Sequence, residues 1–141
     1  MAVSAGTQLE ILAHHHDMAL QTRKRDGSWI ATPVNPLVEG DHVYFRTWQT
    51  SGKAKRLRNF PEVRFAPSTA RGRPTGSWSR GRATLLDRDE AAHAAELLNR
   101  RYPLLQGIAV RVYHRLRGYR TLHYRISEIT SDMANDPTLF G

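Results

Sequence analysis

The chain has 141 residues, of which 40% are hydrophobic, and a formal net charge of +8. That length suits one folded domain with a single core, and the hydrophobic content excludes a disordered tail. The absence of cysteine excludes a disulfide framework, thiolate chemistry and a cysteine zinc site. The positive charge favours anionic partners, which include nucleic acid, acidic membranes and polyanionic small molecules.

The chain also lacks signals for membrane insertion and secretion. No apolar run approaches the ~20 residues of a membrane span. Residues 1–6 have neither the basic start nor the apolar block of a signal peptide. We therefore expect a cytoplasmic protein without a membrane span.

Alternating and β-branched segments predict about six strands with turn signals between them. Asp26 and Gly27 form the first turn, because Asp-Gly readily takes the positive φ angles of tight hairpins. Pro33 and Pro36 have no N–H for a ladder, so the second strand is interrupted there or lies at an edge. A turn at 39–41 precedes the third strand. The expected strands cover residues 18–23, 29–34, 43–47, 63–67, 77–86 and 121–126.

Helical patterns occupy residues 9–16, 51–59, 91–102 and 104–116. Ser51 caps the second of these, with Ala54 and Leu57 facing inward. Residues 87–90 resemble a capping box at the start of the third helix. The tail at 131–141 reads as loose. These patterns predict a mainly β (α+β) fold, a small closed or partly closed barrel with a few peripheral helices. It forms a single domain over 1–141, with a core of about 17–130.

The segment at 47–59 carries the strongest functional signal, because it joins a strand to the start of a helix. Small hydroxyl residues, a glycine and a lysine stand there among backbone N–H groups that a helix leaves unpaired. This arrangement favours phosphate binding, with an ordinary helix cap and solvated lysines as the alternative. Ser51 and the free amides supply hydrogen bonds, whereas Lys53 and Arg56 supply positive charge from a similar helical face.

Five short motifs in the same order resemble the flavin and deazaflavin split-barrel proteins, the pyridoxamine 5′-phosphate oxidase-like class. The motifs are TRKRDG (22–27), TPV (32–34), YFRT (44–47), SGKAKRLRN (51–59) and ARGRPTG (70–76). The chain is most similar to the actinobacterial branch of deazaflavin (coenzyme F420)-dependent enzymes. The resemblance runs from about residue 19 to residue 129.

The resemblance implies a six-stranded split barrel that forms a homodimer, with cofactor sites at the dimer interface. It implies that the cofactor phosphate lies near the third strand and the following helix, at Arg46, Thr47, Trp48, Ser51, Gly52, Lys53 and Arg56. It also implies that the tricyclic ring lies along the second strand, at Thr32, Pro33, Val34 and Asn35. The family usually has a large aromatic residue in place of Asn35. The loop at 72–76, with Arg73, Pro74 and Thr75, is implied to approach the cofactor, either from the same subunit or from the partner subunit.

The activity that the resemblance implies is hydride transfer from a reduced deazaflavin to a small organic substrate. An FMN-binding oxidase or reductase is the alternative, because both cofactors present a ribityl phosphate. A non-catalytic cofactor carrier or a polyanion- or nucleic-acid-binding barrel is a third hypothesis, although no recognised RNA-binding motif appears. The basic surface favours the deazaflavin, whose tail is acidic. The residues identify no substrate and no catalytic group, and Asn35, Trp48 and Tyr124 are the candidates for positioning a proton.

The remaining polar clusters have simpler interpretations. Three consecutive histidines at 14–16 fan out on a helix, so we predict no metal site there. Lys55 and Arg58 are expected to face water. The loop arginines at 71 and 73 also suit an ordinary basic surface. A second basic cluster suits a solvated helix face, with a polyanion or membrane-surface contact as the alternative. Its members are Arg111, His114, Arg115, Arg117 and Arg120.

Overall fold

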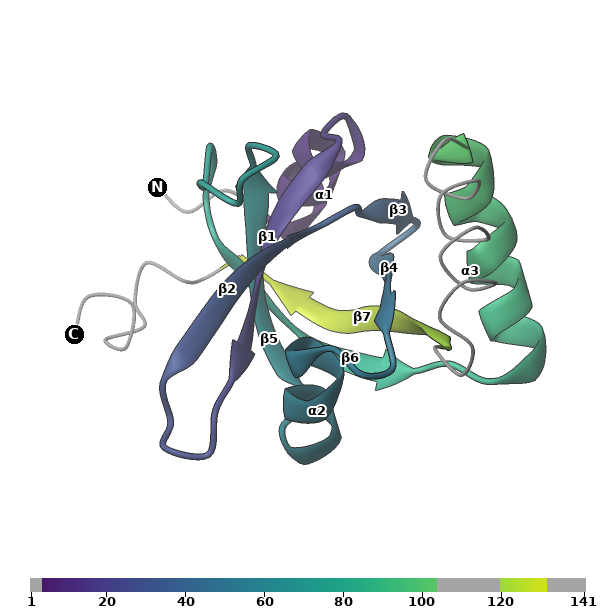
Figure 1. The fold of residues 1–141 in the computed structure, drawn as a ribbon. Coiled ribbons are helices and arrows are strands. Elements are labelled where there is room, and N and C mark those ends of the chain that lie inside the picture. Colours follow the sequence, from purple (N-terminus) through teal and green to yellow (C-terminus); the bar gives the residue numbers. More distant parts are fainter. Residues whose placement is uncertain (1–3, 104–119, 132–141) are drawn as a thin grey trace.

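The computed structural model describes residues 4–103 and 120–131. Within them, seven strands form one antiparallel sheet in the order β2-β1-β5-β6-β7-β4-β3. The sheet curls until β2 contacts β4, and the three helices of the described residues pack around it (Figure 1). The predicted mainly β fold with peripheral helices is therefore confirmed.

The strands are β1 (Asp17–Arg23), β2 (Trp29–Val34), β3 (Leu37–Glu39), β4 (His42–Trp48), β5 (Glu62–Ser68), β6 (Ser79–Leu85) and β7 (Thr121–Thr130). The helices are α1 (Ala5–Ala13), α2 (Gly52–Asn59) and α3 (Arg88–Arg101).

The β1–β2 hairpin forms as its turn chemistry predicts. Gly27 takes a φ of 89°, which a residue with a side chain rarely adopts. The Asp26 carboxylate accepts a hydrogen bond from the Ser28 amide at 2.9 Å. Strand β2 pairs only with β1 and forms one edge of the sheet, where Pro33 is tolerated.

The predicted strand number is wrong, because the sheet has seven strands rather than six. The additional strand is β3, a three-residue segment that pairs with β4. It lies between Pro36 and the turn at Gly40, and it is too short to show an alternating pattern. Strand β7 is also longer than expected, because it continues to Thr130.

The helix starts depart from the sequence patterns in two places. Helix α1 begins earlier than expected, because the Ser4 hydroxyl caps it by accepting from the Thr7 amide at 3.2 Å. The capping box at 87–90 does not form. Asp87 makes no side-chain cap bond, Arg88 has a φ of 40°, and the Glu90 carboxylate pairs instead with Arg125. The predicted helix at 104–116 and the tail at 132–141 lie outside the described residues.

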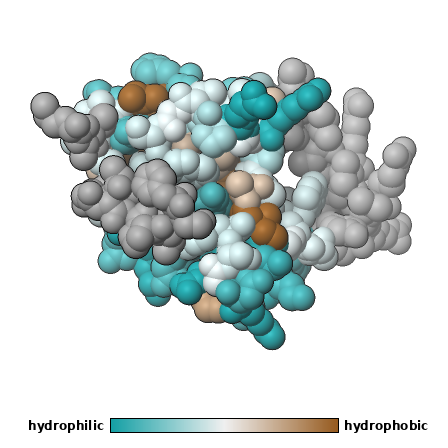
Figure 2. Space-filling model, turned by 90° about the vertical axis from the view of Figure 1, so that its left-hand side faces the viewer, coloured by the Kyte–Doolittle hydropathy of each residue, from teal (hydrophilic) through white to brown (hydrophobic). Residues whose placement is uncertain are grey.

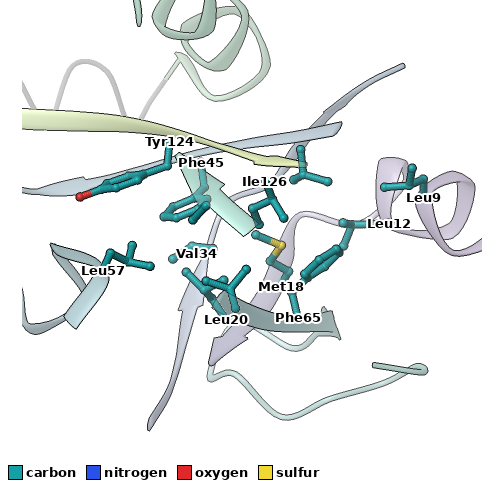
Figure 3. Close-up of a cluster of buried hydrophobic side chains, with 13 residues drawn as sticks. Leu9, Leu12, Met18, Leu20, Val34, Phe45, Leu57, Phe65, Tyr124 and Ile126 are labelled. Carbon is teal, nitrogen blue, oxygen red and sulfur yellow. The ribbon is translucent and has the colours of Figure 1, made fainter. Parts of the chain in front are cut away.

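Two hydrophobic clusters hold the elements together. The larger lies inside the curled sheet and joins β1, β4, β5 and β7 with α1 and α2 (Figure 3). The smaller lies between the sheet and α3 and contains Tyr44, Leu86, Ala94, Leu98 and Tyr102. Among the described residues on the face in Figure 2, hydrophilic residues and residues of intermediate hydropathy surround small hydrophobic areas. No described helix combines the length and apolarity that crossing a membrane requires.

Candidate anion-binding site

The start of α2 is locked to the end of β4 by two hydroxyl groups. Ser51 is the N-cap residue, and its Oγ accepts from the Ala54 amide at 3.1 Å. The buried Thr47 hydroxyl donates to the same Ser51 Oγ at 3.0 Å. The predicted cap is therefore confirmed, and the geometry of the strand-to-helix turn is set by local hydrogen bonds.

Gly52 and Lys53, the next two residues, offer free backbone amides and a positive charge that has no acidic partner among the described residues. The amides of Gly52 and Lys53 donate to no backbone carbonyl within the described chain. Lys53 is half-buried, and this burial, together with the charge of Arg56, lowers the pKa of its ammonium group. No carboxylate of the described residues offsets either effect. An anion bound here would favour the charged form of Lys53 and raise its pKa.

The Arg56 side chain is hydrogen-bonded to a strand residue and lies over a glycine. Its Nε donates to the Oγ1 of Thr22 at 2.6 Å, and Thr22 is fully buried on β1. A Cβ built on Gly52 would lie 2.8 Å from the Arg56 Nη1 atom. The guanidinium therefore lies across Gly52, and a side chain at position 52 would displace it.

A basic hollow of about 370 Å³ opens between the β1–β2 turn and α2. Five of its lining residues are lysine or arginine, and none of its described lining residues is acidic. Lys55 is exposed as expected but belongs to this lining, whereas Arg58 is exposed outside it. The lining residues are Arg23, Lys24, Arg25, Gly52, Lys55, Arg56, Asn59 and Phe60.

The sequence interpretation missed most of the lining of this basic hollow. Arg23, Lys24 and Arg25 appeared only inside a motif, and the signal was that three consecutive cations flank a tight turn. The Arg23 guanidinium lies 5.5 Å from the ring centre of Phe60. Only the folded structure shows that α2 places Lys55 and Arg56 beside Arg23, Lys24 and Arg25.

Strand β2 runs away from the basic hollow and carries an orphaned polar atom. The Thr32 hydroxyl oxygen is buried and has no hydrogen-bond partner. Thr32 pairs with Leu20, whereas Trp29 at the turn end pairs with Arg23, so the two positions are three residues apart along the strand. That spacing is ~10 Å. A ligand that reached both places would be elongated.

The loop at 69–76 packs against this part of β2. A Cβ on Gly72 would lie 3.4 Å from the Pro33 Cδ, and Gly72 has a φ of 87°. The Thr69 amide donates to the Arg73 carbonyl at 2.9 Å, which closes the loop. Arg73, Pro74 and Thr75 are exposed beside it. The loop and the second strand that the resemblance links are thus neighbours within one chain.

Two predicted site residues lie elsewhere or already have partners. Successive side chains of a strand point to opposite faces, so Arg46 leaves β4 on the face opposite to Thr47. Its Nη1 donates to the Asn99 Oδ1 on α3 at 2.5 Å. The side-chain Nδ2 of Asn35 donates to the His16 carbonyl at 3.0 Å, which ties Asn35 to the start of β1.

The other candidates have structural environments. Trp48 is half-buried at the end of β4, and Val34 is buried in the main core. Tyr124 is buried and stacks on Phe45 at 5.1 Å, and burial raises the pKa of its hydroxyl. Within the described residues, no group of His, Asp or Glu side chains is arranged to hold a metal. Arg120 is exposed, and the rest of its cluster lies outside the described chain.

Comparisons with known proteins identify the fold. No family model matches the chain, and no curated protein matches it by sequence. A candidate pyridoxamine 5′-phosphate oxidase from Listeria innocua is 17% identical, with a TM-score of 0.54 over 89% of this chain and 94% of that one. A candidate 5-nitroimidazole antibiotic resistance protein from Bacteroides thetaiotaomicron is 16% identical, with a TM-score of 0.64 over 92% and 86%.

A heme-binding protein from Mycobacterium smegmatis is also similar. It is 18% identical, with a TM-score of 0.58 over 89% of this chain and 52% of that one. The TM-scores of these three neighbours show that they share the fold of this chain. The protein therefore has the fold of the pyridoxamine 5′-phosphate oxidase-like split-barrel proteins.

Proposed function

We propose that this protein binds a phosphorylated flavin-type cofactor and is an oxidoreductase that uses the deazaflavin coenzyme F420. The observation that carries the proposal is the half-buried Lys53, which lies beside Arg56 without an acidic partner among the described residues. A bound phosphate would offset this charge and accept hydrogen bonds from the free amides of α2. The proposal includes a cytoplasmic homodimer with cofactor sites at its interface.

The described residues divide the work of holding such a cofactor. Lys53, Arg56 and the amides at the start of α2 would hold the phosphate. The orphaned Thr32 hydroxyl and the edge of β2 would face the ring, with the loop at Gly72 beside it. Hydride transfer to an electron-poor substrate bond is the chemistry that a reduced deazaflavin supplies. The protein's part is to orient both reactants and exclude water.

The basic hollow favours the deazaflavin over FMN. It continues from Arg56 to the β1–β2 turn with five cationic side chains and no described acid. FMN has one phosphate group, which Lys53 and Arg56 alone would neutralise. The deazaflavin adds a phosphodiester and a glutamate tail, and the additional cations suit these extra anionic groups.

A parallel titration tests the proposal. Oxidised coenzyme F420, FMN and hemin are each added to the purified protein, and tryptophan quenching and cofactor fluorescence are measured. Lys53→Ala is the test variant. Arg58→Ala is its matched control, because it removes one charge from the same helix at an exposed position, whereas Lys53 is half-buried.

We expect micromolar binding of coenzyme F420, weaker binding of FMN, and a loss of about tenfold or more in Lys53→Ala. Arg58→Ala should bind as the parent does. Tight FMN binding with the same variant pattern would support the FMN alternative. Binding of hemin alone, or of no cofactor, would contradict the proposal. In the latter case steeply salt-dependent oligonucleotide binding would favour the polyanion-binding barrel.

A further inference from the structure

A second cation without an acidic partner lies on the other side of the sheet. Arg46 is half-buried between β4 and α3, and its Nη1 is held by the Asn99 Oδ1 at 2.5 Å. Its Nη2 atom is buried and has no hydrogen-bond partner. Buried donors of this kind are rare in native proteins and usually indicate a ligand, an ion or a water at that place.

The neighbour of Arg46 across the strands is another basic group. His123 stands directly opposite it in the β4–β7 register and is half-buried. Burial, and then the charge of Arg46, lower the pKa of the His123 imidazole. Apart from burial, only Tyr102 influences the pKa of Arg46 among the described groups. No described carboxylate therefore offsets the positive charge at this pair.

We propose that Arg46 and His123 form a second oxyanion site, which binds a carboxylate or phosphate group against α3. Oxyanions accept two parallel hydrogen bonds from a guanidinium, and Asn99 leaves Nη2 available for one of them. A water molecule would accept the hydrogen bond but would not offset the half-buried charge. The oxyanion would also stabilise protonated His123, which could then donate to it.

This site is independent of the cofactor proposal. Arg46 and Thr47 are adjacent in β4 and therefore point to opposite faces of the sheet. The Thr47 hydroxyl contacts Ser51 at the start of α2, whereas Arg46 contacts Asn99 on α3. Loss of the α2 site should leave the Arg46–His123 site intact, so the two proposals can fail separately.

The experiment follows the His123 imidazole by nuclear magnetic resonance in labelled protein. Inorganic phosphate and acetate are titrated separately, with chloride at matched ionic strength as the reference. We expect a saturable shift of the His123 signals and a rise in its pKa with phosphate, acetate or both. The anion that saturates at the lower concentration identifies the preferred group.

Three variants locate the effect. Arg46→Met should abolish the saturable shift, and Lys53→Ala should retain it. Because Arg46→Met removes a half-buried side chain, Asn99→Asp is the second test. It places a carboxylate beside Arg46 with little change in volume, so it should raise the His123 pKa without added anion and weaken anion binding about tenfold.

Several outcomes would overturn the proposal. A shift equal to that with chloride would reflect screening only. Anion binding that survives Arg46→Met, or that disappears in Lys53→Ala, would place the anion elsewhere. An Asn99→Asp variant with unchanged His123 pKa and unchanged anion affinity would show that Arg46 does not serve as the anchor.

Discussion

At the scale of single residues, the candidate site depends on how Arg56 is held. A surface arginine samples many rotamers, and binding must then pay for ordering it. Here Thr22 accepts from its Nε, and Gly52 leaves room for its guanidinium. Both residues act through Arg56 and are positioning residues for an anion.

Replacing Thr22 tests this role. Thr22→Val removes the acceptor while keeping a similar shape, so we expect cofactor affinity to fall by roughly threefold to tenfold. Arg56 can still reach water, so the free energy of unfolding should change by only about 1 kcal/mol. Thr22→Ser should restore binding. Fluorescence titration and thermal melting measure the two effects, and equal affinities in all three proteins would refute the positioning role.

At the scale of elements, α3 is attached to the sheet by both a hydrophobic cluster and a polar one. Leu98 and Ala94 are fully buried against Tyr44. Beside them the Glu39 carboxylate accepts from the His93 Nε2 at 3.0 Å. His42 lies 3.6 Å from the same carboxylate. The hydrogen bond from His93, and then the nearby histidine charges, lower the pKa of Glu39 below 4.5.

This polar contact predicts a pH dependence with a definite sign. Because folding lowers the Glu39 pKa, the contact contributes stability above the unfolded pKa and loses it as pH falls through the folded value. His93→Phe removes the donor and should therefore return the Glu39 pKa toward 4.5. Carboxyl carbon resonances measure that change.

Both partners are partly exposed, so the change in unfolding free energy should be small. Arg100→Gln is the control, because it breaks only the exposed pair with Glu96. A Glu39 pKa that does not move in His93→Phe would show that His42 and Tyr44, and not His93, determine it.

At the scale of the whole molecule, the larger hydrophobic cluster joins the strands that carry both sites. Met18, Leu20, Phe45 and Ile126 are fully buried together, as Figure 3 shows. Leu20 pairs with Thr32 on one side and Phe65 on the other. The β1–β2 hairpin therefore depends on this core for its position relative to α2.

Truncating Leu20 tests that dependence. Leu20→Ala leaves a cavity at a fully buried position and should lower the free energy of unfolding by about 2–5 kcal/mol. Denaturant unfolding measures the loss. Ile11→Ala is the control, because Ile11 is 41% exposed and its truncation should cost much less. Similar losses in both variants would contradict the assignment of Leu20 to the core.

The sequence predicted the local features well because nearby residues decide them. The Asp26-Gly27 turn, the edge character of β2 and the Ser51 cap follow from φ preferences and from short-range hydrogen bonds. Strand β3 was not predicted, because three residues are too few to show a periodic pattern. The predicted capping box does not form, because Glu90 pairs with Arg125, which lies on a strand distant in sequence.

The candidate site divides in the same way. Its residue types and the strand-to-helix turn at 47–59 were determined by the sequence, as was the excess of positive charge. Only the tertiary structure brought Arg23 to Arg56 and Arg46 to Asn99, because the packing of the helices on the sheet is set by the core. Hydrogen bonds between neighbours act within a few residues, whereas the burial that orients distant side chains belongs to the folded sheet as a whole.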